Sequence, residues 1–289
     1  MSKKPVPTQL PYQQIIAAIE AIPGLESLSD WLVTALGPVT RQRQLMDLLH
    51  GRWLGHSLHP ALSDVPIGMW VSVPVLDLIG DRTGATLLTA MGCIVSGATA
   101  ATGAADWSVT VGRDRRLALV HGLANTTVLG LQLASLAARL RGRTGRGRLL
   151  SAAGLTAGVA AAYLGGELVF GRALAVDHDA WIYGPSEWTD VAAETDVSEG
   201  AVTVVDVESR KILLTRVDGR LSALENTCTH AGGPLNEGTV EDGDIVCPWH
   251  GSRFRLSDGA VLGGPATFPV RQLETRTAAG RVQNRDRQD

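Results

Sequence analysis

The sequence predicts a protein of two parts, an all-α membrane bundle of about four transmembrane helices followed by an all-β domain. Up to about residue 175 the chain contains long runs without charge that are rich in Ala, Gly, Leu and Val. Beyond that point it is polar, rich in Thr and Val, and interrupted by Asp-Gly and Gly-Gly pairs, which favour turns. The net charge also changes sign, from +5 over residues 1–175 to −8 over residues 176–289. A bundle in lipid and a β domain in water account for the two halves.

Composition and charge exclude two broad classes. The 289 residues include 26 basic and 29 acidic side chains, a net charge of −3, so we expect no nucleic-acid partner. An apolar fraction of 45% excludes an extended disordered chain. Three cysteines are too few for a disulfide scaffold and indicate metal ligation instead.

Residues 1–49 are predicted to form an amphipathic helical segment. The stretches QQIIAAIEAI and SLSDWLVTAL have the apolar spacing of helices that lie on a membrane surface or cap a bundle. The first residues, MSKKPVPTQL, contain neither an apolar export segment nor a twin arginine. We therefore expect the β domain to stay in the cytoplasm.

Residues 50–178 are predicted to form the membrane domain. Residues 83–105, 117–138 and 149–166 are charge-free runs of 23, 22 and 18 residues, each about long enough to cross a ~30 Å hydrocarbon core. A fourth candidate, 65–76, is charge-free over only 12 residues and contains two prolines. With four spans, seven arginines fall on the side of the C-terminal domain and six on the other side, which weakly favours a cytoplasmic C-terminal domain.

Ionisable residues in or beside the apolar runs need a function or a partner, because their burial in lipid is unfavourable. Two readings remain open for them. His59 and His121 could ligate a b-type haem between helices, or the group could form a hydrogen-bonded structural or proton-handling cluster. The candidate residues for this site are His56, His59, His121, Asp106 and Glu167.

Several stretches of this region carry a resemblance. The LGHSLHP and PIG stretches, the Asp106-Trp107 pair, the cluster from His121 to Asn125, and YLGGELV resemble a bacterial family of four-helix membrane domains of unknown function. The resemblance covers roughly residues 50–178. It implies four spans and a multi-pass position in the bacterial cytoplasmic membrane, with the lipid bilayer as partner, but no established activity.

The pattern of the C-terminal part predicts strands and turns. AVTVVDVE, KILLTRV and RLSALEN carry β-branched or alternating apolar residues, and Val-Asp-Gly-Arg at 217–220 predicts a hairpin turn. We expect residues 179–188 to form a linker, 189–285 a compact antiparallel domain, and 286–289 a tail.

Two short motifs in this part carry metal-binding chemistry. Cys228 and His230 form C-x-H, Cys247 and His250 form C-x-x-H, and 16 residues separate the two pairs. The same four residues could bind structural zinc, but C-x-H is shorter than the usual zinc spacings and both pairs lie in Gly/Pro loops. The motifs resemble those of Rieske iron-sulfur domains, over about residues 187–285.

The resemblance implies a [2Fe-2S] cluster in which one iron takes the two thiolates and the other takes two neutral imidazoles, which raises the reduction potential above that of all-Cys clusters. It also implies roles for Gly251 in the turn, Ser252 as a donor to a cluster sulfur, and Pro265 in the loop that covers the cluster. Gly233 and Phe254 stand where the quinol-oxidising class has a disulfide cysteine and a hydrogen-bonding tyrosine. We therefore expect a lower potential than in that class.

A Rieske centre passes single electrons and does not itself transform a substrate. No histidine follows His250, so the chain lacks the 2-His-1-carboxylate iron site of a usual oxygenase subunit, and we expect no catalytic residue. The sequence predicts a membrane-anchored one-electron carrier, an electron-transfer component of an oxidoreductase system, whose partner is a redox protein, a quinone or a reductase. The alternative is a membrane-bound redox sensor that uses the cluster without electron relay.

Overall fold

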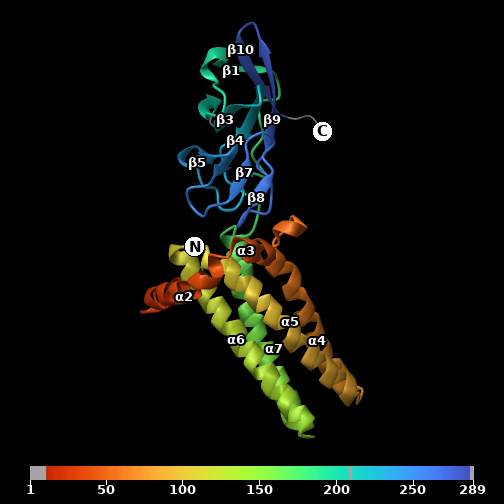
Figure 1. Cartoon of the computed structure of the whole chain (residues 1–289). Coiled ribbons are helices and arrows are strands. Elements are labelled where there is room, and N and C mark those ends of the chain that lie inside the picture. The colour runs from red at the N-terminus through yellow and green to blue at the C-terminus, as the bar shows by residue number, and fades with distance from the viewer. Residues whose placement is uncertain (1–10, 208–209, 287–289) are drawn as a thin grey trace, which may run out of the picture. The chain divides into compact units, whose positions relative to one another are not determined.

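The computed structural model describes residues 11–207 and 210–286 (Figure 1), and their contacts form two compact units. The helical unit joins residues 11–41 to His59–Arg172. The β unit joins Gln42–Leu58 to residues 173–286 and contains all the described strands. An all-α part followed by an all-β part confirms the predicted fold class. The N-terminal stretch 1–10 and most of the predicted tail lie outside the described residues.

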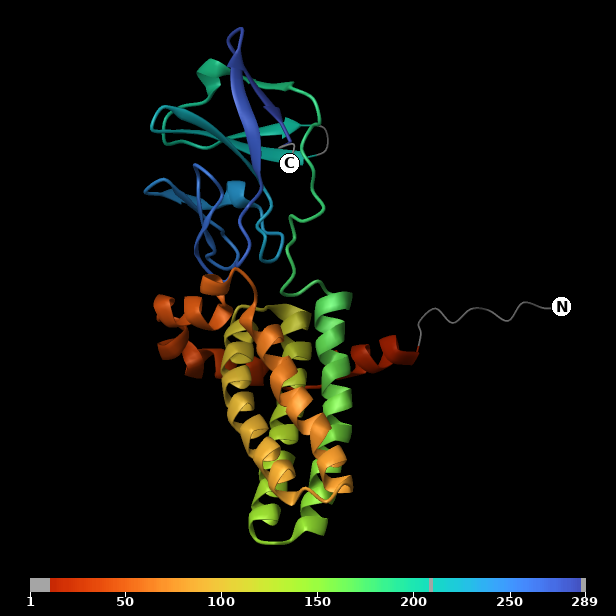
Figure 2. The same ribbon diagram turned by 90° about the vertical axis from the view of Figure 1, so that its right-hand side faces the viewer.

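Four long helices make up most of the helical unit, and Figure 2 shows them running alongside one another. Each is long and apolar enough to cross a membrane, as predicted. They are α4 (Leu58–Leu78), α5 (Arg82–Ser108), α6 (Gly112–Leu140) and α7 (Thr144–Gly166), and α7 continues as the π-helical turn η2 (Glu167–Gly171).

Helix α4 is longer than the charge-free run that predicted it, and it accommodates Pro66 and Pro74 in its interior. Large apolar side chains on the bundle, among them Val71, Ile94 and Val159, remain more than half exposed. Such a surface suits contact with lipid, where a helix needs no apolar protein partner.

Two shorter helices, α1 (Pro11–Glu20) and α2 (Leu25–Thr40), pack on the bundle at the start of α6. Leu25 of α2 lies in one apolar cluster with Trp107 and Leu119. Arg113 of α6 pairs with Glu20 of α1 at 3.0 Å. The amphipathic segment therefore caps one end of the bundle, the end at which α5 finishes and α6 begins.

The β unit contains two antiparallel sheets. The larger has the strand order β1-β10-β9-β4-β3-β2, and its edge strands β1 and β2 approach each other, so that it nearly closes into a barrel. The smaller has the order β5-β6-β7-β8. The strands are β1 (Thr189–Ala193), β2 (Thr203–Val207), β3 (Arg210–Val217), β4 (Arg220–Glu225), β5 (Thr239–Glu241), β6 (Asp244–Val246), β7 (Arg253–Arg255), β8 (Val261–Gly263), β9 (Gln272–Ala278) and β10 (Arg281–Arg285).

Short helical segments complete the β unit. They are α3 (Arg43–His50), η1 (Arg52–Leu54), η3 (Glu194–Asp196) and η4 (Leu235–Glu237). The predicted hairpin joins β3 to β4, and its two central residues, Asp218 and Gly219, both have positive φ (50° and 74°), as a type I′ turn requires. One apolar core, which includes Leu213, Leu224 and Ile245, lies beneath the loops that carry the Cys and His motifs.

Candidate functional site

The first motif lies in the loop that follows strand β4. The backbone N–H of Cys228 donates to the carbonyl of Gly233 (2.8 Å), and the carbonyl of Cys228 accepts from Gly232 (2.8 Å). Gly232 has φ +73°, a conformation that is unstrained only for glycine. These bonds fold the loop into a tight turn around the side chain of Cys228.

The second motif lies between β6 and β7 and repeats this backbone arrangement. The N–H of Cys247 donates to the carbonyl of Ser252 (2.8 Å), and the carbonyl of Cys247 accepts from Gly251 (3.1 Å). Gly251 has φ +74°. In both loops the cysteine therefore bonds to the residues four and five positions later, although the histidine follows it by two positions in one loop and by three in the other.

The loops bring the four motif side chains together in two pairs. Cys228 and Cys247 are buried in the apolar core. His230 and His250 are half-buried, and their ring centroids lie 4.9 Å apart at an interplanar angle of 87°. The site thus presents two thiols on its inner side and two imidazoles on its outer side.

The histidine pair is suited to bind a metal as neutral ligands. The Nδ1 atom of His230 is buried and has no hydrogen-bond partner among the described residues. Burial, together with the nearby His250, His50 and His178, lowers the pKa of His230 to about 3. A neutral imidazole with a free lone pair is the form that ligates metals.

The two thiols share a hydrogen bond that makes one of them acidic. The bond from Cys228 lowers the pKa of Cys247 to about 6, and backbone N–H groups of Trp249 and His250 add to this effect. The same bond raises the pKa of Cys228, together with burial. Because the thiolate is the ligand form of cysteine, this pair fits a metal centre whose positive charge deprotonates both thiols.

A third loop closes over the second motif. The N–H of Ala266 donates to Oγ of Ser252 (3.0 Å), and Ser252 and Pro265 are both buried. Since Oγ already accepts this bond, the hydroxyl hydrogen of Ser252 is available to donate to another acceptor. The donor set of two thiols, two imidazoles and one hydroxyl fits a Rieske cluster.

Comparison with known proteins identifies this part of the chain. Residues 187–274 match the Rieske [2Fe-2S] domain model. The ferredoxin component of the naphthalene 1,2-dioxygenase system of Pseudomonas aeruginosa is 32% identical over 96 residues, which cover 33% of this chain and 92% of that protein. The chain belongs to the Rieske [2Fe-2S] family.

Further matches fall in the Rieske part and in the membrane part. Ferredoxin CarAc of Metapseudomonas resinovorans is 35% identical over 97 residues, or 33% of this chain and 90% of that protein. The solved ferredoxin of carbazole 1,9a-dioxygenase from Nocardioides aromaticivorans IC177 aligns with a TM-score of 0.32 and 27% identity, over 35% of this chain and all of that one. Residues 55–179 match a family described as predicted membrane protein (DUF2231).

The structure shows the surroundings of Gly233 and Phe254, the two positions at which the sequence predicted departures from the quinol-oxidising Rieske class. A Cβ atom on Gly233 would lie 3.0 Å from Sγ of Cys247 and 3.1 Å from the ring of Trp249, so this position of the Rieske unit has no room for a side chain. Phe254 is fully buried in the core beneath the loops and has no hydroxyl to donate.

Two residues near the site were missed at the sequence level. Asp47 of α3 accepts a bond from the N–H of Gly264 in the third loop (Oδ1 to N, 2.8 Å), and His50 is buried beside the same glycine. Both belong to residues 42–58, which form part of the Rieske unit. Their spacing of three on an amphipathic helix is the one signal that could have marked them.

The structure brings together only some of the ionisable residues predicted for the membrane part. The rings of His59 and His121 lie close together and nearly perpendicular, with centroids 6.4 Å apart and an interplanar angle of 88°. His56 instead lies in the Rieske unit against the ring of Phe268 (6.0 Å). Glu167 approaches Arg172 (3.8 Å), and Asp106 is half-buried near the C-terminal end of α5.

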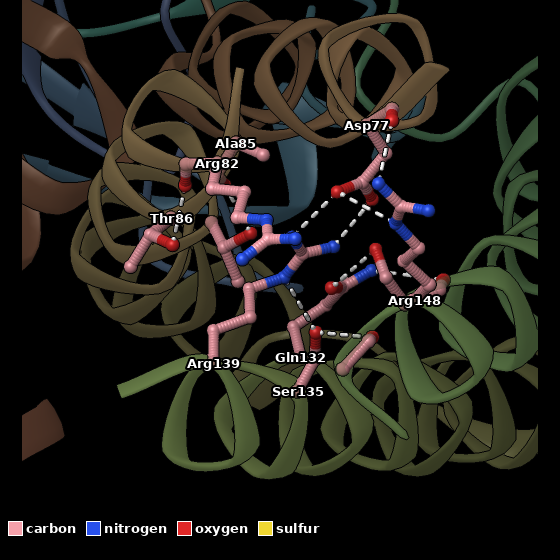
Figure 3. Close-up of polar contacts among 11 residues, drawn as sticks. Asp77, Arg82, Ala85, Thr86, Gln132, Ser135, Arg139 and Arg148 are labelled. Atoms are coloured by element: carbon pink, nitrogen blue, oxygen red, sulfur yellow. Dashed lines mark hydrogen bonds and ion pairs between the residues drawn. The ribbon is translucent and has the colours of Figure 1, made fainter. Parts of the chain in front are cut away.

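A buried ionic network occupies the helical unit at the turn between α6 and α7 (Figure 3). Arg139 donates two bonds to the carboxylate of Asp77 on α4 (2.8 and 2.7 Å), and Arg148 lies 3.3 Å from the same carboxylate. Ser135 accepts a further bond from Arg139, and Gln132 accepts from Ser151. The pair explains how two charged residues are tolerated in the observed helices α4 and α6, just beyond the charge-free runs.

Proposed function

We propose that Cys228, His230, Cys247 and His250 hold a [2Fe-2S] cluster and that the chain is a membrane-anchored one-electron carrier. The observation that carries this proposal is the pair of loops with one backbone arrangement, which gathers two thiols and two neutral imidazoles at one place. The cluster, when bound, gains or loses one electron without transfer of any atom.

The chain's own residues set the properties of this site. The core around Cys228 and Cys247 keeps water from the thiolate side, while the half-buried His230 and His250 leave an outer side for a redox partner. The hydroxyl of Ser252 and the turn at Gly251 direct hydrogen-bond donors toward the cluster, and Pro265 closes the covering loop. In this proposal residues 189–285 act as the electron-transfer domain and residues 50–178 as its anchor.

The relatives indicate the class of partner. They include ferredoxin components of the naphthalene 1,2-dioxygenase system, so we propose that the chain accepts electrons from a reductase, a quinol or a haem group and delivers them to an oxygenase or a similar acceptor. The net charge of −8 beyond residue 175 supports docking to a basic partner. We propose a bacterial cytoplasmic membrane location, with the Rieske unit on the cytoplasmic side.

The test uses the full chain purified in detergent. The wild-type protein is expected to give a Rieske-type EPR signal after reduction with dithionite, and His230→Ala and Cys247→Ala are expected to abolish it while the chain stays in the membrane fraction. His178→Ala, which changes a histidine outside the ligand set, serves as control. A retained signal in His230→Ala contradicts the ligand assignment.

The competing function is a redox sensor, in which the cluster changes contacts in the protein without passing electrons on. The two functions differ in turnover. Rapid, repeated oxidation and reduction by a ferredoxin reductase and an acceptor supports the carrier. A proteolysis pattern that depends on cluster oxidation, in a protein that is not turned over, supports the sensor.

A further inference from the structure

The second half of the membrane bundle repeats the first with an offset of 62 residues. Identical residues recur at this spacing through the α4–α5 and α6–α7 hairpins without a gap. Fixed-offset similarity of this kind is the mark of an internal repeat. The identical pairs include His59/His121, Gly68/Gly130, Gly80/Gly142, Leu87/Leu149, Leu88/Leu150, Gly92/Gly154, Ala98/Ala160 and Gly103/Gly165.

Contacts repeat with the same offset, although the side chains differ. In the first hairpin Nε1 of Trp70 donates to the carbonyl of Thr89 (3.4 Å). In the second, Nε2 of Gln132 donates to the carbonyl of Ser151 (3.4 Å). Each of these donors also packs against the glycine three residues beyond its acceptor. The two hairpins therefore repeat this contact, although α6 and α7 pack more closely against each other than α4 and α5 do.

Two pairs of equivalent residues contact each other. Asp77 and Arg139 are 62 positions apart and form the buried ion pair. His59 and His121 are also 62 positions apart, and their rings lie close together at an interplanar angle of 88°. Equivalent residues of two repeats can meet only near the axis that relates the repeats. The histidine pair thus lies on a pseudo-twofold axis of the bundle, near the end at which α4 begins and α7 finishes.

Each histidine is held in the same way by the neighbouring helix. Nδ1 of His59 donates to the carbonyl of Thr99 (3.0 Å), and Nδ1 of His121 donates to the carbonyl of Ala161 (2.9 Å). Because a carbonyl only accepts, both Nδ1 atoms carry the proton and both Nε2 atoms keep a lone pair. A backbone acceptor of this kind fixes the ring of a metal-ligating histidine.

Glycines complete the two half-sites. Four residues after each acceptor carbonyl, Gly103 and Gly165 lie against the histidine rings. A Cβ atom at these glycines would come within 2.7 Å of Cε1 of His59 and 2.9 Å of Cε1 of His121. The close packing positions both rings without a side chain between ring and helix.

We propose that His59 and His121 bind a b-type haem, one imidazole on each face of the porphyrin. Metal–nitrogen bonds of ~2.0 Å to two opposed rings place the ring centroids about 6 Å apart, and the observed separation is 6.4 Å. A porphyrin has two equivalent faces, so it suits two equivalent ligands on a twofold axis. This inference deepens the proposed function, because it places a redox group for the membrane side in the same chain.

The number of ligands favours haem over a bare metal ion. The site brings together two histidines, one from each repeat, whereas structural zinc takes four protein ligands. Haem iron receives four nitrogens from the porphyrin and needs only two more. Nε2 of His121 is approached by Nδ2 of Asn125 (3.2 Å), and this exposed amide has to turn away on ligation.

The test is the haem content of the full chain, expressed with a haem precursor and purified in detergent. The pyridine haemochrome assay is expected to give one b-type haem per chain, and the reduced-minus-oxidised spectrum a sharp band in addition to the broad Rieske absorbance. His59→Ala and His121→Ala are each expected to lose at least tenfold in haem content. His56→Ala and Asn125→Ala are matched controls that should retain it.

The outcomes separate this inference from the cluster. Wild-type protein that contains cluster iron but no haem, or zinc in place of haem, overturns the inference and leaves the Rieske assignment intact. Equal haem content in His59→Ala and wild type also overturns it. His230→Ala is expected to lose the Rieske EPR signal and to keep the haem band, whereas His59→Ala is expected to keep the Rieske signal, which shows that its Rieske unit is folded.

Discussion

Asp179 is expected to make the Rieske unit less stable as the pH rises toward neutrality. Its side chain is 2% exposed, and Oδ2 accepts the backbone N–H of Arg271 at 2.8 Å. Oδ1 is buried without a hydrogen-bond partner among the described residues. Burial raises the pKa of Asp179 from 3.8 to about 7, and the negative charge of Glu225 adds to the effect against the opposing bond from Arg271.

The size of the effect follows from linkage between protonation and folding. The unfolded chain ionises Asp179 near pH 3.8, but the folded chain does so only near pH 7, a difference of about three pH units. The folded state is therefore disfavoured by up to about 4 kcal/mol once the pH exceeds 7, and the penalty disappears below pH 4. Between pH 5 and pH 8 the expected loss is about 2 to 3 kcal/mol.

Asp179→Asn tests this because the amide oxygen can still accept from Arg271 but cannot ionise. We expect the variant to have a higher free energy of unfolding than wild type. This advantage should be about 2 to 3 kcal/mol larger at pH 8 than at pH 5. Guanidinium titrations of the detergent-purified chain, followed by circular dichroism across this range, measure the difference. Asp196→Asn, which removes an exposed charge from η3, is the control. Wild-type and Asp179→Asn curves that run parallel from pH 5 to pH 8 refute the reasoning.

Three further predictions concern the cluster site and the bundle. Ser252→Ala removes the hydroxyl donor and should lower the reduction potential of the cluster by roughly 60 mV, which equals about 1.4 kcal/mol for one electron. A dye-mediated redox titration measures this shift, and an unchanged potential contradicts the role of the hydroxyl. Gly233→Ala places a methyl group 3.0 Å from Sγ of Cys247 and should reduce the iron content per chain, whereas full occupancy speaks against the packing argument. Asp77→Asn leaves Arg139 buried without its counter-ion and should destabilise the bundle by about 3 to 5 kcal/mol, seen as a lower thermal midpoint in detergent. Combining it with Arg139→Gln should recover part of the loss, and additive losses would argue against a direct pair.

The features that were predictable from the sequence are those determined by short, local stretches of the chain. Charge-free runs marked the membrane helices, and the alternation in KILLTRV with its Asp-Gly turn marked the hairpin of β3 and β4, because both depend on neighbours in the chain. The Cys and His motifs were recognisable for the same reason, since each loop is stabilised by bonds within six residues.

The features that were missed depend on contacts between distant residues. The third predicted span ended before Arg139, although helix α6 continues through this residue. The sequence did not show that Arg139 is tolerated there, because its partner Asp77 is 62 positions away. Asp47 reaches Gly264 across 217 positions, so no local pattern assigns residues 42–58 to the Rieske unit. The repeat in the bundle was present in the sequence, but its matching glycines and histidines are few among many alanines and leucines. The repeated contacts in the structure are needed to distinguish this match from chance.

The central claim is that this chain carries electrons through a Rieske cluster held by Cys228, His230, Cys247 and His250. Its most direct test is iron analysis combined with EPR of the dithionite-reduced, detergent-purified chain. The account predicts two irons per chain in the cluster, beyond any haem iron, with one unpaired spin in a Rieske-type signal that is lost in His230→Ala. Bound zinc with no reducible signal, or a Rieske signal that survives in His230→Ala, would contradict it.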